Sequence, residues 1–154
     1  IRVVLENIGC PNGMGLTADS KHIYFTDSAA LKIYLFDYDE ETGQLSNQRV
    51  FVETLNGHGD PDGMTVDAEN HVWSARWGDW AVYRYSPDGV EERRVLIPTK
   101  QPASVTFGGD DYSDMYVATA GGHNRSENGA TAGALYRVRT GIHGRPEFHS
   151  RVGL

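Results

Sequence analysis

The chain has 154 residues, which is the size of one ordinary domain and enough to bury a core. Its hydrophobic content of 39% and charged content of 23% are those of a globular protein and exclude a disordered chain. A formal net charge of −7, with no run of Lys or Arg, argues against nucleic acid as a partner.

Nothing in the sequence indicates contact with a membrane, because no apolar run approaches the ~20 residues that span a bilayer. No signal peptide is visible. The chain contains one cysteine, Cys10, so no internal disulfide can form. These features favour a cytoplasmic location but leave the compartment unknown.

Two copies of one pattern follow each other along the chain. The first opens with Pro-Asn-Gly-Met at 11–14 and the second with Pro-Asp-Gly-Met at 61–64. Runs rich in β-branched and aromatic residues follow each opening, at 22–27, 32–37 and 49–53 in the first copy and at 71–76, 81–85 and 94–97 in the second. Turn residues separate these runs, which predicts strands.

A third, weaker copy begins with Gln-Pro-Ala-Ser at 101–104. It has strand-like runs at 105–107, 115–119 and 134–138, and residues 148–152 could close it. No window of useful length has the periodicity of an amphipathic helix. The predicted fold class is therefore all-β.

The spacing of the copies predicts propeller blades. The prolines of the three openings stand 50 and 41 residues apart, and a four-stranded unit of roughly 40–50 residues is typical of a β-propeller blade. We predict three four-stranded blades, at 11–54, 61–98 and 102–152, with 1–10 as a strand that belongs to or closes a preceding blade. The alternative, a plain antiparallel meander with coincidental turns, does not account for the aligned openings.

Three blades do not close a ring, because closed propellers have about 4–8 blades. Either an N-terminal half is missing, or a second copy of the chain completes the ring about a two-fold axis.

The openings carry the candidate metal ligands. The first strand of a propeller blade lies beside the central channel, so we expect Asn12, Asp62 and Ser104 to point toward the axis at similar heights. One neutral and one anionic oxygen suit a hard cation such as Ca²⁺, and Zn²⁺ or Mn²⁺ with less preference. Pro-Asn-Gly and Pro-Asp-Gly are also strong turn sequences. Their recurrence at the same place in two copies favours ligands over simple turns.

Three further side chains are candidates for a substrate pocket on the same face. They are His58, Trp77 and His123, the last in a long loop at 120–133. Long loops in compact domains are often functional. The alternative is that both histidines lie on the surface and that Trp77 packs between blades.

The sequence resembles the regucalcin/gluconolactonase family over essentially all of its 154 residues, in order. The resemblance rests on segments spread along the chain, namely 11–13, 24–27, 36–39, 61–67, 76–78, 84–89, 107–109 and 132–138. It implies a six-bladed propeller roughly twice this length, with one divalent cation held in the channel by a Glu, an Asn and an Asp.

In that resemblance Asn12 matches the family's Asn ligand and Asp62 its Asp ligand. Ser104 matches a channel position whose identity is less fixed. The Glu ligand, and a second Asn and an Arg that contact substrate in relatives, would lie in the missing N-terminal half. This chain departs from the family in lacking that Glu and much of the substrate wall.

The leading functional hypothesis is metal-assisted hydrolysis of a small, sugar-type lactone. Asp62 would bind the cation, with Ca²⁺ favoured and Zn²⁺, Mn²⁺ or Mg²⁺ as alternatives, and would accept a proton from the attacking water. No Gly-x-Ser-x-Gly motif indicates a serine nucleophile. Two alternatives stay open. One is a non-catalytic metal-binding propeller that binds a ligand or protein, and the other is a broader esterase or phosphotriesterase.

Overall fold

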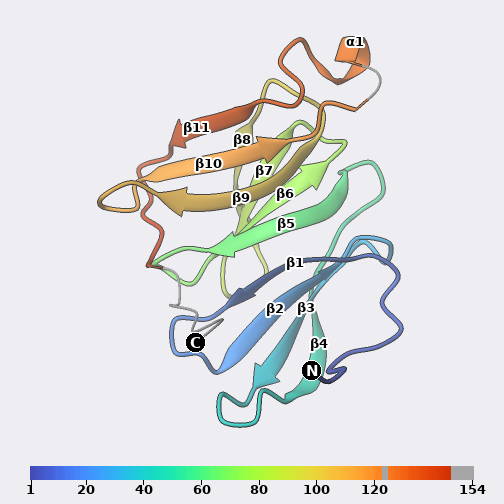
Figure 1. Ribbon diagram of the computed structural model, residues 1–154, viewed down its shortest axis with the longest axis vertical. Helices are drawn as coiled ribbons and strands as arrows, with labels where there is room; N and C mark the ends of the chain where they lie inside the picture. Colours follow the sequence, from blue (N-terminus) through green and yellow to red (C-terminus); the bar gives the residue numbers. More distant parts are fainter. Residues whose placement is uncertain (123–124, 147–154) are drawn as a thin grey trace.

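The structure is a computed structural model that describes residues 1–122 and 125–146 (Figure 1). Its strands form three antiparallel sheets. The first contains β1 (Pro11–Leu16), β2 (His22–Asp27), β3 (Lys32–Tyr38) and β4 (Leu45–Glu53). The second contains β5 (Asp60–Val66), β6 (Val72–Trp77), β7 (Ala81–Tyr85) and β8 (Glu91–Leu96). The third contains β9 (Pro102–Gly108), β10 (Asp114–Thr119) and β11 (Leu135–Arg139).

A single helical turn, α1 (Arg125–Asn128), lies in the connection between β10 and β11. The described part of the chain has no helix with the length and apolar character needed to cross a membrane.

The same turn joins the first two strands of the first two sheets. The Thr17 N–H donates to the His22 carbonyl at 3.0 Å, and the Asp67 N–H donates to the His71 carbonyl at 2.9 Å. Ser20 and Asn70 occupy equivalent places and have positive φ angles of 55° and 61°. Left-handed backbone is uncommon outside glycine and is best tolerated by residues such as Asn. The repeated pattern in the sequence therefore corresponds to a repeated backbone conformation.

The first strands of the three sheets, β1, β5 and β9, lie side by side (Figure 1). Each sheet then continues outward from its first strand, strand by strand. In the second sheet the last strand, β8, is almost entirely exposed, whereas every residue of the third strand, β7, is buried. The three openings recognised in the sequence therefore meet at one shared inner edge.

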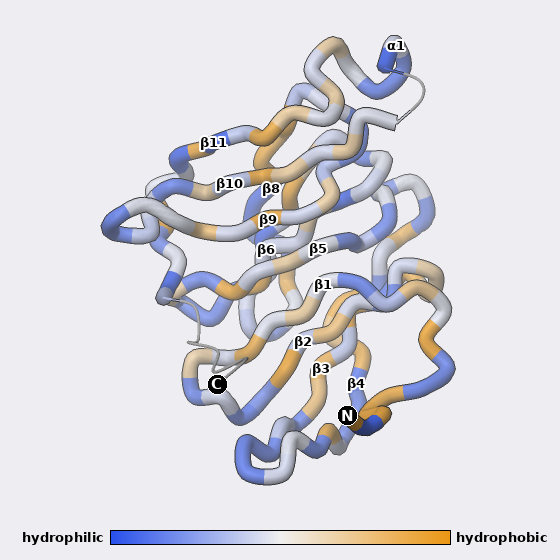
Figure 2. The backbone as a smooth tube through the Cα atoms, viewed as in Figure 1, coloured by the Kyte–Doolittle hydropathy of each residue, from blue (hydrophilic) through white to orange (hydrophobic). Residues whose placement is uncertain are grey.

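The sheets pack face against face and bury two hydrophobic clusters. One lies between the first and second sheets and the other between the second and third, and both include residues of β6 and β7. In β6, Val72 belongs to the first cluster and its neighbour Trp73 to the second. Alternate side chains of a strand point to opposite faces. Because both faces of the second sheet are covered, β6 is buried from Val72 to Arg76. Figure 2 shows hydrophilic residues concentrated in the turns between strands.

Two glycines allow the first strands to approach closely. A Cβ atom placed on Gly13 would lie 2.5 Å from the Met64 nitrogen and 2.6 Å from the Asp62 carbonyl oxygen. A Cβ on Gly63 would lie 2.6 Å from the Ser104 Oγ and 2.7 Å from the Ala103 carbonyl oxygen. Backbone atoms crowd both positions, so neither can accept a side chain unless the sheets move apart.

Replacing Gly13 by alanine is therefore expected to destabilise the protein by about 1–3 kcal/mol, as is usual for overpacking. The measurement is urea unfolding of the variant and the wild type. Gly121 is the matched control, because an added Cβ there would meet nothing closer than 3.6 Å. Equal unfolding midpoints for Gly13→Ala and Gly121→Ala would contradict the close approach of β1 and β5.

The all-β prediction is confirmed, and the first two predicted blades form four-stranded sheets. The third has three strands among the described residues, and the predicted closing strand at 148–152 lies outside them. β4 begins at Leu45, earlier than the sequence predicted. The prediction missed its first residues because they are mostly exposed and lack a hydrophobic alternation. Residues 1–8 contain no strand. A strand needs a partner, and the preceding blade predicted to pair with this segment is not part of this chain.

Candidate site at the mouth of the channel

The Asn12 and Asp62 side chains are placed by matching irregularities in β1 and β5. Pro11 pairs with Asp27 and Met14 with Phe25, so two residues of β1, at 12 and 13, face one residue of β2. In the second sheet Pro61 pairs with Arg76 and Met64 with Ser74, which gives β5 the same extra residue at 62 and 63. Such bulges bend a strand and redirect the side chains within it. The Pro-x-Gly segments are thus parts of bulged strands and not turns.

The structure brings the side chains of Asn12 and Asp62 together. Both are partly buried, and the Asn12 side chain is close enough to the Asp62 carboxylate to affect its pKa. Burial raises the pKa of Asp62 above its usual value of 3.8, the Asn12 amide and the Gly63 N–H oppose this rise, and the charge of Asp60 adds to it. The net rise means that the Asp62 anion is incompletely stabilised by its protein surroundings. A cation at this place would stabilise it.

Ser104 stands one residue further along its strand than the sequence predicted. Pro102 pairs with Thr119 and Ser104 with Ala118, so the extra residue of β9 is Ala103. Counted from the prolines, Ala103 takes the place of Asn12 and Asp62, and Ser104 takes the place of the glycines at 13 and 63. The third copy lacks the Gly-Met pair that aligns the other two, so its register could not be fixed from the sequence.

A cavity of about 390 Å³ lies along the three first strands, and neither Asn12 nor Asp62 contributes to its wall. Ser104 is exposed and contributes to its wall. The other lining residues come mainly from equivalent positions of the three strands, at 14–16, 64–66 and 105–106, together with Ile23 and Arg145. The wall therefore mixes apolar side chains with hydroxyl groups. Such a surface suits a small, partly polar molecule.

The other predicted pocket residues do not all gather here. Trp77 ends β6 opposite Asp60, so it lies at the same end of the second sheet as Asp62, and it is exposed. His58 lines a different cavity, of about 260 Å³, together with Tyr83 and residues of β4 and β8. Its Nδ1 lies 3.5 Å from the Tyr83 hydroxyl. The structure thus does not bring His58 to the Asn12–Asp62 pair. His123 lies outside the described residues.

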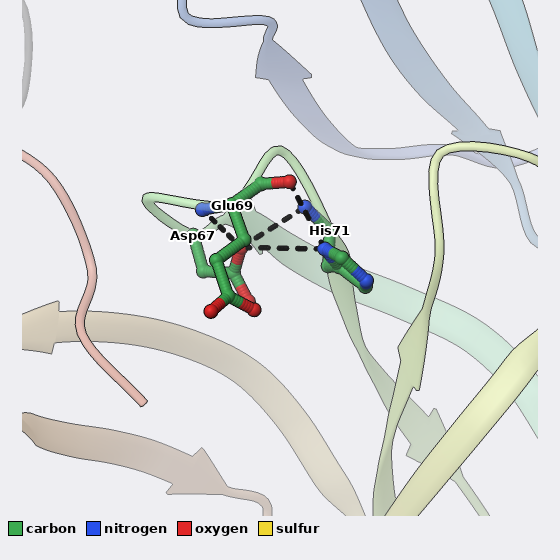
Figure 3. Close-up of side chains that lie close together, drawn as sticks. All are labelled: Asp67, Glu69 and His71. Carbon is green, nitrogen blue, oxygen red and sulfur yellow. Dashed lines mark hydrogen bonds and ion pairs between the residues drawn. The ribbon is translucent and has the colours of Figure 1, made fainter. Parts of the chain in front are cut away.

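A second group of metal-type ligands lies at the other end of β5. Potential ligand atoms of Asp67, Glu69 and His71 are all within 4.8 Å of one another (Figure 3). The buried Asp67 carboxylate, however, already accepts hydrogen bonds from four N–H groups. They belong to the backbone of Glu69 and His71, the Trp73 indole and the Arg84 guanidinium, each at 2.9 Å.

The Arg84 guanidinium supplies the positive charge that this group requires. It pairs with Asp67, with Glu69 and with Glu92, the last at 3.0 Å. His71 also contacts Glu92, with 3.1 Å between Nε2 and the carboxylate. A planar guanidinium with several fixed donors is suited to bind more than one carboxylate. We therefore interpret the Asp67 group as an ion-pair network, which leaves Asn12 and Asp62 as the candidate metal ligands.

Comparison with known proteins places this geometry in context. The family model described as SMP-30/gluconolactonase/LRE-like region matches residues 1–121. The chain is 45% identical to pentonolactonase XacC of Haloferax volcanii, over all of this chain and 55% of that protein. It is 38% identical to L-arabinolactonase of Azospirillum brasilense, over 77% of this chain and 39% of that protein.

Among solved structures, the chain is similar to the calcium-binding protein regucalcin of Agrobacterium tumefaciens. The TM-score is 0.85 at 29% identity, over 98% of this chain and 52% of that one. This likeness confirms the predicted propeller fold. The chain spans about half the length of the relatives it matches.

Proposed function

Because this chain belongs to the SMP-30/gluconolactonase/LRE-like family, as its motifs predicted, we propose that it forms part of the channel of a small-lactone hydrolase. The observation that supports this proposal is the pairing of Asn12 with Asp62 at the start of adjacent first strands. Two relatives are named as lactonases of sugar type, a pentonolactonase and an L-arabinolactonase. A sugar-type lactone is therefore the proposed substrate class.

The donor set fits a hard divalent cation. Asp62 would contribute a carboxylate oxygen and Asn12 a neutral carboxamide oxygen, which together favour Ca²⁺ over softer ions. The raised pKa of Asp62 agrees with this role, because an anion held in partly buried surroundings gains from a nearby cation. Ca²⁺ takes about 6–8 oxygen ligands. Water, substrate and residues outside this chain would complete the set.

A bound cation would polarise the lactone carbonyl and stabilise the oxyanion that forms on it. Asp62 would accept a proton from the attacking water as that water adds to the carbonyl carbon. The ring C–O bond then breaks, and the released alkoxide takes up the proton that Asp62 accepted, which gives an open-chain hydroxy acid and restores the Asp62 carboxylate. Asn12 would add an oxygen ligand without adding negative charge, which keeps the site from becoming too anionic.

We also propose that a companion half closes the ring. Residues of the same polypeptide outside this chain, or a second copy, would supply it. The observation that supports this proposal is that the chain spans about half the length of its relatives.

The test is a substrate panel on the intact protein with metal removed and restored. Pentonolactones, hexonolactones, simple esters and a phosphotriester are assayed after chelation with EDTA and after addition of Ca²⁺, Mn²⁺, Mg²⁺ or Zn²⁺. We expect lactone turnover that EDTA abolishes and that one of the cations restores. Tight cation binding without turnover of any substrate would instead support a binding module. Preferential turnover of esters or the phosphotriester would support the broader hydrolase.

A further inference from the structure

The link between β2 and β3 reaches both candidate ligand strands through one side chain, Ser28. The Asn12 Nδ2 lies 3.3 Å from the Ser28 Oγ. The same Oγ lies 2.6 Å from the carbonyl oxygen of Pro61, the residue before Asp62. Ser28 belongs to the first blade and Pro61 to the second, so this hydroxyl connects the two blades beside the Asn12–Asp62 pair.

The hydrogen-bonding capacity of these groups fixes how the Asn12 carboxamide is oriented. A serine hydroxyl has one proton to donate and lone pairs to accept with. The Pro61 carbonyl can only accept, so the Ser28 proton goes to it, and the Ser28 oxygen must then accept from Asn12. Only the amide nitrogen of Asn12 can donate. The nitrogen therefore faces Ser28, and the carboxamide oxygen points away from it.

The nearby Asp62 carboxylate favours the same orientation. An ionised carboxylate only accepts hydrogen bonds, so the amide nitrogen is the end of the Asn12 side chain that it attracts. Over residues 1–122 and 125–146, no protein donor is hydrogen-bonded to the Asn12 oxygen. That oxygen is the atom that the site can offer to a cation.

Ser28 is itself held in place by its surroundings. The buried carboxylate of Asp27 accepts from the N–H groups of Gly9 at 3.2 Å, Cys10 at 3.0 Å and Ala30 at 3.3 Å. The Ser28 N–H donates to the Cys10 carbonyl at 3.0 Å. These bonds join the link to the segment immediately before β1. The hydroxyl is thus presented to Asn12 from a fixed backbone.

The fold does not require a serine at this place. By the pairing of the strands, the residue equivalent to Ser28 is Trp77 in the second sheet and Ala120 in the third. Neither has a hydroxyl, yet the first strands of both sheets also contain a bulge. The serine occurs in the blade that carries the candidate Asn ligand. The carboxamide of an Asn has an oxygen at one end and a nitrogen at the other, so its orientation matters for binding a cation.

We propose that Ser28 is a positioning residue for cation binding. It turns the Asn12 carboxamide so that the oxygen faces the cation, and it holds Pro61 beside the first blade. This inference rests on the proposed function, because it assumes that Asn12 and Asp62 bind a cation. Residues that orient metal ligands typically contribute about 10–100-fold in metal affinity.

The experiment compares Ser28→Ala, Ser28→Thr and the wild type in the intact protein. Calorimetric titration with Ca²⁺ gives the affinity, and urea unfolding of the metal-free protein gives the stability. We expect Ser28→Ala to weaken Ca²⁺ binding by about 10–100-fold, and Ser28→Thr, which keeps the hydroxyl, to restore most of it. Ser46→Ala, an exposed serine of β4, is the matched control and should bind Ca²⁺ like the wild type.

A second comparison separates orientation from a purely structural role. In an Asn12→Asp background the side chain has two equivalent oxygens, so there is no amide to orient, and Ser28→Ala should no longer weaken Ca²⁺ binding. A loss of the same size in both backgrounds would overturn the inference. So would unchanged affinity in Ser28→Ala when the wild type binds Ca²⁺ tightly, and the proposed function would then stand. A wild type that binds no divalent cation would overturn both.

Discussion

Replacing Asp62 by asparagine is expected to lower kcat/KM for lactone hydrolysis by about 10²–10⁴-fold, the usual contribution of a general base. The substitution keeps the size of the side chain and one oxygen, but it removes the negative charge and the ability to accept a proton. Both properties are central to the role proposed for Asp62. Steady-state kinetics with a lactone on the intact protein, and calorimetric titration with Ca²⁺, measure the two losses separately.

The folded structure should tolerate this change. Burial already raises the pKa of Asp62, which means that the protein stabilises the neutral form relative to the anion. A neutral asparagine should therefore leave the metal-free protein at least as stable as the wild type in urea. Asp88→Asn is the control, because it removes the same charge from an exposed turn of the same blade. An Asp62→Asn variant with normal turnover and normal Ca²⁺ affinity would end the proposal.

The sequence predicted the place of the candidate site because the site coincides with a repeat. Two openings with the same Pro, Gly and Met align Asn12 with Asp62, and the structure gives both strands the same bulge. In the third copy, where the repeat is weaker, the predicted position is wrong by one residue. Ser104 was expected level with the other two, but Ala103 takes that place. A bulge adds a residue without a marker in the sequence unless a conformationally required glycine accompanies it.

Contacts between segments far apart in the chain could not be predicted in this way. Ser28 meets Asn12 and Pro61 only because one blade packs beside the next. His58 sits in a glycine-rich connection near the predicted face, yet its ring turns toward Tyr83 in a separate cavity. The direction of a loop side chain depends on tertiary packing, and no repeating pattern of residues in the sequence indicates it.

The buried arginines are also features that the sequence pattern does not predict. Arg76 and Arg84 occupy strand positions where hydrophobic patterning would predict apolar residues. Arg76 is fully buried, donates to the Thr54 hydroxyl at 2.5 Å and lies 5.0 Å from the centre of the Tyr83 ring. Arginine can occupy such places because its planar guanidinium stacks on aromatic rings and has donors for several partners. These partners come from other strands and turns, so hydrophobic periodicity does not reveal them.

Arg84→Met is expected to be the most destabilising of the substitutions considered, by about 3–5 kcal/mol in urea unfolding, as for other broken buried ion pairs. Arg84 is 6% exposed and Asp67 is fully buried. Burial alone would lower the pKa of Arg84, but hydrogen bonds to Glu69 and Asp67 raise it, so the guanidinium keeps its charge. Methionine fills much of the same volume but leaves the Asp67 anion without its cation.

An exposed ion pair provides the control. Arg49 lies 2.9 Å from Asp37, and both side chains are more than a third exposed. Arg49→Met should cost about 0–1 kcal/mol, the usual contribution of a surface pair. The difference between the two variants isolates the effect of burial, because each removes one guanidinium and adds the same thioether. A loss below about 1 kcal/mol for Arg84→Met, no larger than that of a surface pair, would contradict the network.

The double variant Arg84→Met with Asp67→Asn tests whether the uncompensated anion is the cause. The asparagine introduced in place of Asp67 would be neutral, and its oxygen could still accept from the N–H groups of Glu69 and His71. We therefore expect the double variant to be more stable than Arg84→Met alone, a non-additivity of about 0.5–3 kcal/mol typical of contacting residues. If the Asp67 group were instead a cation site, Ca²⁺ would restore the stability of Arg84→Met. With a guanidinium network, Ca²⁺ should leave that loss unchanged.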